Sequence, residues 1–103
     1  MPAATRDLPH PDLSAVELTA VLFALSDPAR LELIRLVARD GARTIANCQA
    51  VDPTAPKSTF SHHLKTLREA GLIRNEPHGR QRMISLRRDE VAERFPGLLE
   101  SVL

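Results

Sequence analysis

Aromatic residues and cysteine are scarce in this chain, and both shortages limit what it can be. Its 103 residues include three phenylalanines, no tryptophan and no tyrosine. The core must therefore be built mainly from Leu, Ile, Val and Ala, and a small core of this kind is often completed by a second subunit. The single cysteine, Cys48, excludes an internal disulfide framework and fits a reducing compartment.

Long apolar runs are also missing. No segment approaches the ~20 consecutive apolar residues that a membrane-spanning helix needs. The N-terminal stretch MPAATRDLPHPD carries acid and proline where a signal peptide would need an apolar region. We therefore expect a cytoplasmic protein with no membrane association. Its length suits one domain with a modest core.

The motifs that mark common enzyme active sites are absent from the sequence as well. It contains no Gly-rich phosphate loop, no HExxH motif and no nucleophile elbow. Ser61 and His62 are neighbours in the sequence, but adjacent side chains on a helix diverge by about 100° and cannot form a catalytic dyad. We predict that the chain is not an enzyme and has no catalytic residues.

The segment from residue 56 to residue 72, PKSTFSHHLKTLREAGL, has the spacing of an amphipathic helix. Phe60, Leu64 and Leu67 follow the i, i+4, i+7 pattern of one apolar stripe, and Gly71 suits a left-handed helix end. Such a helix fits a DNA major groove, although an ordinary solvated helix has the same pattern. Its opposite face is small, polar or basic and contains Lys57, Ser58, Ser61, His62 and Lys65.

Basic residues are concentrated in and after this helix. Residues 57–88 contain eight Lys or Arg and two Glu, a net charge of +6, whereas the rest of the chain carries −5, which gives the overall +1. Segregated charge of this kind predicts one cationic surface, as expected for contact with phosphates.

The remaining pattern predicts a series of short elements. Residues 1–12 form a proline-rich flexible arm, and residues 13–103 form one domain. A first helix starts at a capping box, Ser14 to Glu17, with Leu13 and Leu18 as its hydrophobic staple. Further predicted elements are a helix capped by Asp27 and ending near 40, a short helix over 45–50 capped by Thr44, strands over 72–76 and 82–86 around a hairpin tip at 77–80, and a last helix capped by Asp89 and interrupted at Pro96-Gly97.

This order predicts a mainly α protein with a two-stranded β-wing, arranged α-α-α-α-β-β-α. The third and fourth helices form a helix-turn-helix, and the hairpin beside them is a wing. The pattern is that of a winged helix-turn-helix domain that binds DNA. The alternative is a winged helix used as a protein-interaction or RNA-binding module, which would not need basic residues on both the helix and the wing.

Three stretches resemble the ArsR/SmtB family of bacterial transcriptional regulators. They are residues 24–31 (ALSDPARL), 58–73 (STFSHHLKTLREAGLI) and 79–86 (GRQRMISL), and the similarity extends over roughly residues 14–95. The resemblance implies a homodimeric repressor that binds an operator palindrome in double-stranded DNA and releases it on a chemical signal. It also implies a bacterial protein that is associated with the nucleoid when bound.

The resemblance also implies roles for particular residues. Residues of the helix, Lys57, Ser58, Ser61 and His62, would approach the major groove, and the chemistry of Lys65 adds it to this set. The wing tip would reach the backbone or the minor groove through Gly79, Arg80, Gln81 and Arg82. The first and last helices would form the dimer interface through Leu18, Val21, Leu22, Leu25, Phe95, Leu98, Leu99 and Val102.

Some other residues have a simpler structural interpretation. Arg30 is interpreted as structural, paired with a Glu or a carbonyl. His63 points about 100° away from His62 and is expected to pack against a neighbouring helix. For Ser58 the alternative to a groove contact is a role as an early-helix cap and nothing more. For Arg87 and Arg88 the alternative is a position at the junction between strand and helix without a specific function.

The signal that such a regulator would sense is not evident in the sequence. Cys48 supplies one thiolate, whereas a metal site built on cysteines needs two or more. The last helix contains no histidine, so a site of carboxylates and histidines is not available there either. We therefore predict no metal and no cofactor, and expect Cys48 to be a small buried hydrophobe. Alternatives are a thiol-redox switch through Cys48, a small apolar ligand at the dimer interface near Phe23 and Phe95, and a regulator without any effector.

Overall fold

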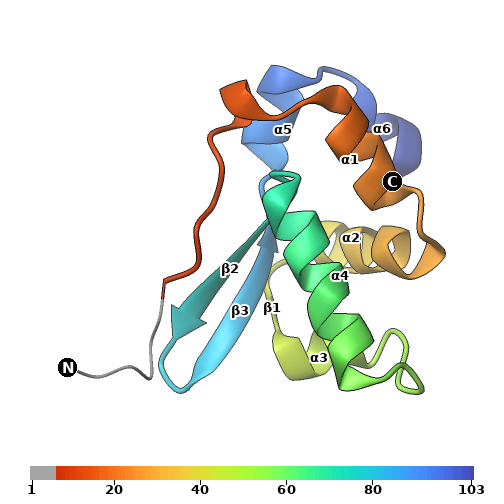
Figure 1. Ribbon diagram of the computed structural model, residues 1–103, viewed down its shortest axis with the longest axis vertical. Helices are drawn as coiled ribbons and strands as arrows, with labels where there is room; N and C mark the ends of the chain where they lie inside the picture. The colour runs from red at the N-terminus through yellow and green to blue at the C-terminus, as the bar shows by residue number, and fades with distance from the viewer. Residues whose placement is uncertain (1–6) are drawn as a thin grey trace.

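The structure, a computed structural model, describes residues 7–103 and contains a winged helix-turn-helix fold (Figure 1). Six α-helices and a small antiparallel sheet confirm the predicted fold class. The elements are η1 (Leu13–Ala15), α1 (Leu18–Leu25), α2 (Pro28–Asp40), β1 (Arg43–Thr44), α3 (Ile45–Gln49), α4 (Lys57–Glu69), β2 (Ile73–His78), β3 (Gln81–Leu86), α5 (Arg88–Arg94) and α6 (Leu98–Val102).

The elements divide between the two ends of the molecule. Figure 1 shows η1, α1, α5 and α6 gathered at one end, while α3, the start of α4 and the tip of the β2–β3 hairpin lie at the other. α2 lies between them, and the C-terminus lies at the end remote from the hairpin tip, beside α1 and α6 (Figure 1). None of the described helices has the length and apolar character needed to cross a membrane.

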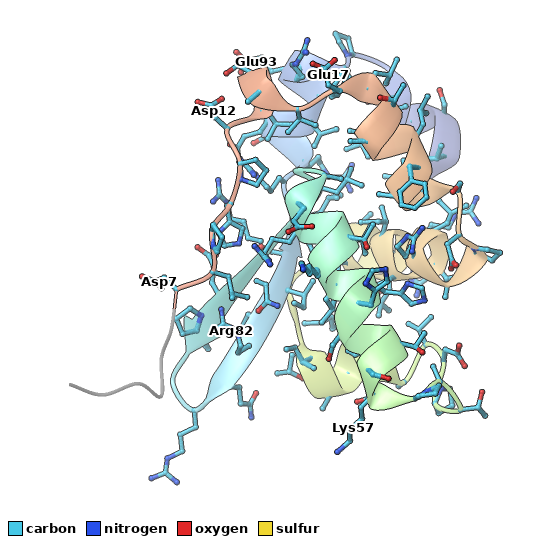
Figure 2. All side chains as sticks on the ribbon, viewed as in Figure 1. Asp7, Asp12, Glu17, Lys57, Arg82 and Glu93 are labelled. Carbon is cyan, nitrogen blue, oxygen red and sulfur yellow. The ribbon has the colours of Figure 1, made fainter. Side chains whose placement is uncertain are left out.

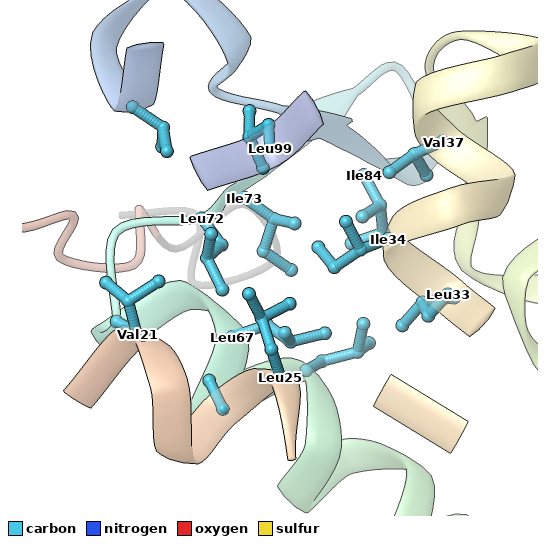
Figure 3. Close-up of a cluster of buried hydrophobic side chains, with 14 of the residues drawn as sticks. Val21, Leu25, Leu33, Ile34, Val37, Leu67, Leu72, Ile73, Ile84 and Leu99 are labelled. Atoms are coloured by element: carbon cyan, nitrogen blue, oxygen red, sulfur yellow. The ribbon is translucent and has the colours of Figure 1, made fainter. Parts of the chain in front are cut away.

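One apolar core joins the two ends. Its fully buried side chains come from the helices and from the sheet (Figure 3), so neither part has a separate core of its own. The largest of them are Leu33, Ile34, Leu67, Leu72, Ile73, Ile84, Val21 and Val91. Burying a side chain of this size stabilises the fold by about 1.5–3 kcal/mol, which orders the short helices that propensity alone would not form.

The predicted helix boundaries hold where a side chain caps the helix. Asp27 accepts hydrogen bonds from the backbone N–H groups of Ala29 and Arg30, with Pro28 at the first position of α2. Thr44 accepts from Asn47 N at the start of α3. Pro96 and Gly97 divide the last helix into α5 and α6, as predicted, and Gly97 has a φ of 82°.

Gly71 ends α4 in the predicted left-handed conformation, with a φ of 78°. The N–H groups of Gly71 and Leu72 donate to the carbonyls of Arg68 and Leu67, which satisfies the last turn of the helix. A Cβ at this position would lie 3.1 Å from the Val16 side chain and 3.2 Å from that of Leu13. Both the positive φ and the close packing therefore favour glycine over any other residue at position 71.

Three sequence-based expectations about local structure were wrong. The sheet has three strands rather than two, in the order β1-β3-β2, because Arg43 and Thr44 pair with Ile84 and Met83. A strand of two residues is too short to show an alternating apolar pattern in the sequence. Its pairing partners lie about 40 positions away in the chain.

The other two corrections concern helix caps. Ser14 does not cap the first helix: its hydroxyl donates to Asp12, which caps the 3₁₀ turn η1, and α1 starts only at Leu18. Leu18 is consequently exposed while Leu13 is buried, so they form no staple. Asp89 lies inside the first turn of α5, whose N-cap is Arg87.

Residues 7–12, placed in the predicted arm, carry no helix or strand but are bonded to the rest of the chain. His10 Nε2 accepts from Asn75 N at 3.0 Å, on the outer edge of β2. Pro9 O accepts from Arg68, and Pro11 O accepts from Arg87. These three bonds attach residues 9–11 to α4, to the edge of the sheet and to the start of α5. The rest of the arm, residues 1–6, lies outside the described residues, and a domain boundary at residue 12 stays a prediction.

Candidate nucleic-acid interface

The exposed side of α4 carries all five residues that the sequence assigned to the groove. Phe60, Leu64 and Leu67 are buried on the other side and anchor the helix in the core. In the described part of the chain, no hydrogen bond or ion pair engages the five side chains, so their donors and acceptors face solvent. They are Lys57, Ser58, Ser61, His62 and Lys65.

Their chemistry suits a groove lined by bases and phosphates. Serine hydroxyls both donate and accept, and His62 offers a donor and an acceptor in its neutral form, as base edges require. Lys57 and Lys65 carry positive charge at the two ends of this face, eight residues apart on the same helix stripe. Figure 2 shows Lys57 projecting from the end of α4 that lies beside α3.

The wing reaches past the body of the protein toward the same end as Lys57 (Figures 1 and 2). β2 and β3 pair without interruption from Ile73 and Leu86 to His78 and Gln81. The two-residue turn at Gly79 and Arg80 closes them, and Gly79 has a φ of 64° with open space around it. This hairpin presents the exposed side chains of Arg80 and Gln81 at its tip.

Arg82, the fourth residue predicted at the wing tip, is turned back onto the wing. Its Nε donates to the Asn75 side-chain oxygen at 2.7 Å, and its Nη2 donates to the Asn75 carbonyl at 2.8 Å. Arg82 thus braces the two strands. A contact between Arg82 and DNA stays a prediction.

Asn75 is a residue that the sequence analysis missed. It is 6% exposed, it is bonded to Arg82 on one side, and its N–H donates to His10 on the other. A polar residue with low strand propensity in the middle of a predicted strand was the available signal, since such residues are usually retained for a bond they make. Asn75 holds the hairpin straight between the body and the tip.

Most arginines of the basic segment serve the fold. Arg74 and Arg87 both bond to Glu90, at 2.6 Å and 2.7 Å. These bonds to Arg87 and Arg74 lower the pKa of the Glu90 carboxyl to about 2. Arg88 donates to Ala38 O. The cationic surface is therefore narrower than the charge count predicted and rests on Lys57, Lys65 and Arg80.

Arg30 and His63, interpreted as structural from the sequence, are placed as expected. Arg30 is 6% exposed and bonds to carbonyls at the end of α1. His63 packs between α4 and α2 and lies 3.1 Å from Arg30.

The residues assigned to a subunit interface fall into two groups. Leu18 and Leu22 are 45% and 48% exposed on α1, and beside them Phe23 is 63% exposed. Phe95, Leu98 and Val102 are half-buried. Val21, Leu25 and Leu99 are buried inside the protomer, so they support the helices and do not line a contact surface.

Cys48 has no exposed surface, and burial raises the pKa of its thiol to about 11. A thiol that stays protonated is a poor nucleophile, which argues against the redox switch considered from the sequence. The adjoining apolar cavity of about 10 Å³ has room for roughly one water molecule. Among residues 7–103, no group of three potential ligands could hold a metal ion.

Comparison with known proteins places this geometry in a family. Residues 25–76, which span α2, α3, α4 and most of β2, match the family described as Helix-turn-helix domain. The chain is 37% identical over 87 residues to the HTH-type transcriptional regulator YceK of Bacillus subtilis, covering 84% of this chain and 87% of that protein.

Solved structures with a similar fold include two regulators. The crystal structure of an ArsR family transcriptional regulator has a TM-score of 0.66 and 25% identity, covering 82% of this chain and 84% of that one. The crystal structure of a possible transcriptional regulator for arsenical resistance has a TM-score of 0.63 and 34% identity, over 78% of this chain and 80% of that one.

Proposed function

This chain belongs to the ArsR family of winged helix-turn-helix transcriptional regulators, and we propose that it is a repressor that binds an inverted-repeat operator as a homodimer. As a member of that family it is a DNA-binding regulator of transcription, not an enzyme. The proposal concerns three points: that it represses transcription, that it binds as a dimer, and which residues contact DNA.

The observation that carries the proposal is the pairing of two exposed surfaces at one end of the molecule. The polar face of α4 and the tip of the wing lie at the same end (Figure 2), and they expose the side chains of Lys57, Lys65 and Arg80 there. α4 would enter the major groove, where Ser58, Ser61 and His62 would meet base edges. Lys57 and Lys65 would contact phosphates.

The wing would add a second contact beside the first. Arg80 would lie along the backbone or in a narrow minor groove, which attracts arginine, and Gly79 and Gln81 would let the turn approach closely. Because Arg82 already bonds to Asn75, its part would be to keep this hairpin rigid.

A homodimer accounts for the apolar surface at the opposite end. Leu18, Leu22 and Phe23 expose large side chains on one short helix, and contiguous exposed apolar surface commonly marks an interface. A two-fold axis there would present two copies of α4 to successive major-groove half-sites about 34–36 Å apart. Occupying such a site near a promoter would block polymerase.

Selection from a random pool of DNA duplexes tests the proposal. We expect recovered sequences to share an inverted repeat, with two protomers bound to each duplex when stoichiometry is measured by analytical ultracentrifugation. A purified protein that stays monomeric and recovers no common sequence would contradict it and favour the protein-interaction or RNA-binding alternative.

A further inference from the structure

Arg30 lies where three helices meet, and its guanidinium connects the end of α1 to α4. Its Nε donates to Ala24 O at 2.7 Å, and its Nη2 donates to Phe23 O at 3.2 Å. Its Nη1 lies 3.1 Å from His63 Nδ1 on α4. A buried cation with three such partners joins α1, α2 and α4 at one point.

This geometry fixes the state of the His63 ring. A guanidinium has only donors, so Nδ1 must accept and the proton of the neutral ring must be on Nε2. Nε2 lies 4.0 Å from the carboxylate of Asp27, the N-cap of α2. The imidazole therefore contacts Arg30 directly and lies near the Asp27 carboxylate, which is too distant for a hydrogen bond.

The neighbours of His63 along α4 are residues of the exposed polar face. His62 points outward, while His63 points toward α2. A rotation of α4 about its axis would displace Ser61 and His62 from the groove, and it would also break the contact between His63 and Arg30. On its other side, the Arg30 guanidinium lies 5.2 Å from the ring centre of Phe23, which is 63% exposed on α1.

We propose that Arg30 and His63 are positioning residues for DNA recognition, and that their contact sets the rotation of α4 relative to α1. Losing the contact should lower affinity for the operator more than general affinity for DNA. Arg80 lies on the wing and does not move with α4, and the long side chains of Lys57 and Lys65 can still reach phosphates after a small rotation, whereas Ser61 and His62 lose their alignment with base edges. The inference rests on the proposed sequence-specific binding by α4.

Two variants separate positioning from simple packing. In His63→Asn, the side-chain oxygen can replace Nδ1 as acceptor and cannot be protonated, whereas His63→Leu leaves Nη1 of Arg30 without a partner. We expect His63→Leu to lose about tenfold or more in affinity for a duplex selected by the wild type, as for a lost hydrogen bond to a charged group. Affinity for a scrambled duplex should change by no more than about twofold. His63→Asn should retain most of the operator affinity.

The ratio of operator to scrambled affinity supplies a readout that lost packing alone would not change. Lost packing should weaken binding to both duplexes, whereas lost positioning should lower this ratio in His63→Leu and leave it near the wild-type value in His63→Asn.

Several results would overturn the inference. Equal operator losses in the Leu and Asn variants, or equal losses on both duplexes, would each show that the contact does not position α4. Circular dichroism establishes that each variant is folded; if His63→Leu is not, a loss of operator affinity in His63→Asn is enough to contradict the proposal. A wild type that binds no selected duplex would instead refute the proposed function, and the positioning role would fall with it.

Discussion

α4 and the wing both carry basic and polar side chains, but these side chains have different roles in the two elements. α4 keeps its polar face free, because its attachment to the protein comes from Phe60, Leu64 and Leu67 in the core. The wing has little core of its own, so it uses Asn75 and Arg82 to hold its strands, and it exposes the basic side chain of Arg80 at its tip.

This difference shows that the net charge counted from the sequence overestimates the number of basic side chains available to DNA. The basic segment carries a net charge of +6, but Arg74 and Arg87 share Glu90, and Arg68, Arg82 and Arg88 donate to carbonyl or amide oxygens. Arginine is suited to such structural roles because its fork can satisfy several carbonyls at once. Arg80 and Arg82, two residues apart on the hairpin, should therefore respond very differently to substitution.

The largest expected effect is on stability, at Arg82. Arg82→Met should lower the free energy of unfolding by about 2–3 kcal/mol, because the buried Asn75 oxygen loses a charged donor. Urea denaturation measures this effect, and Arg80→Met is the matched control, expected to change stability by no more than about 0.5 kcal/mol. Equal losses in the two variants would show that the wing does not use Arg82 as a brace.

The next effect concerns base recognition by α4. His62→Ala should reduce the discrimination between a selected operator and a scrambled duplex by about 1–3 kcal/mol if the imidazole contacts a base, and Ser61→Ala should act in the same direction. Fluorescence anisotropy on both duplexes measures the ratio. Losses of the same size on both would remove His62 from the residues that read sequence.

A smaller and non-specific effect is expected at the wing tip. Arg80→Ala should weaken binding to all duplexes alike and lower the slope of log K against log salt by about 1, because one phosphate contact is lost. Titrations at several salt concentrations test this prediction. An unchanged slope would place Arg80 away from the phosphates.

The smallest effect is expected at the outer edge of the wing, where His10 accepts a bond from Asn75. Burial, together with Arg74 and Arg68, lowers the pKa of His10 below its ordinary value. A lowered pKa in the folded state stabilises the neutral ring, so this contribution is present above about pH 6.5 and is lost as the pH falls through the folded pKa. His10→Gln keeps an acceptor without a charge.

Thermal unfolding from pH 7.5 to pH 5 distinguishes the two proteins at His10. The wild type should lose more stability than His10→Gln over this interval. Identical pH profiles would mean that the bond between His10 and Asn75 contributes nothing measurable.

Sequence patterns predicted the parts of the fold that depend on neighbouring residues. The apolar spacing of Phe60, Leu64 and Leu67, the cap at Asp27 and the left-handed Gly71 are local signals, and the structure confirms each. The capping box at Ser14 failed although it is a local pattern, because Asp12 lies within reach and competes for the same hydroxyl.

Sequence reasoning failed where a partner is distant in the chain. Strand β1 exists only because β3 lies beside it, and the inward turn of Arg82 depends on the hairpin register that brings Asn75 within reach. The predicted dimer residues show the same limit: Val21, Leu25 and Leu99 are buried within the protomer, and apolar periodicity cannot distinguish a side chain buried within one subunit from one buried between two.

By itself the sequence determined the winged helix-turn-helix fold and the polar face of α4, because helical period and turn chemistry act over a few residues. Only the tertiary structure shows which Lys and Arg side chains bond to other parts of the protein and which are exposed to solvent. A guanidinium is long enough to reach partners up to about 80 positions away in the chain, as Arg94 does at Leu13 O, and only packing determines whether it does so or faces DNA.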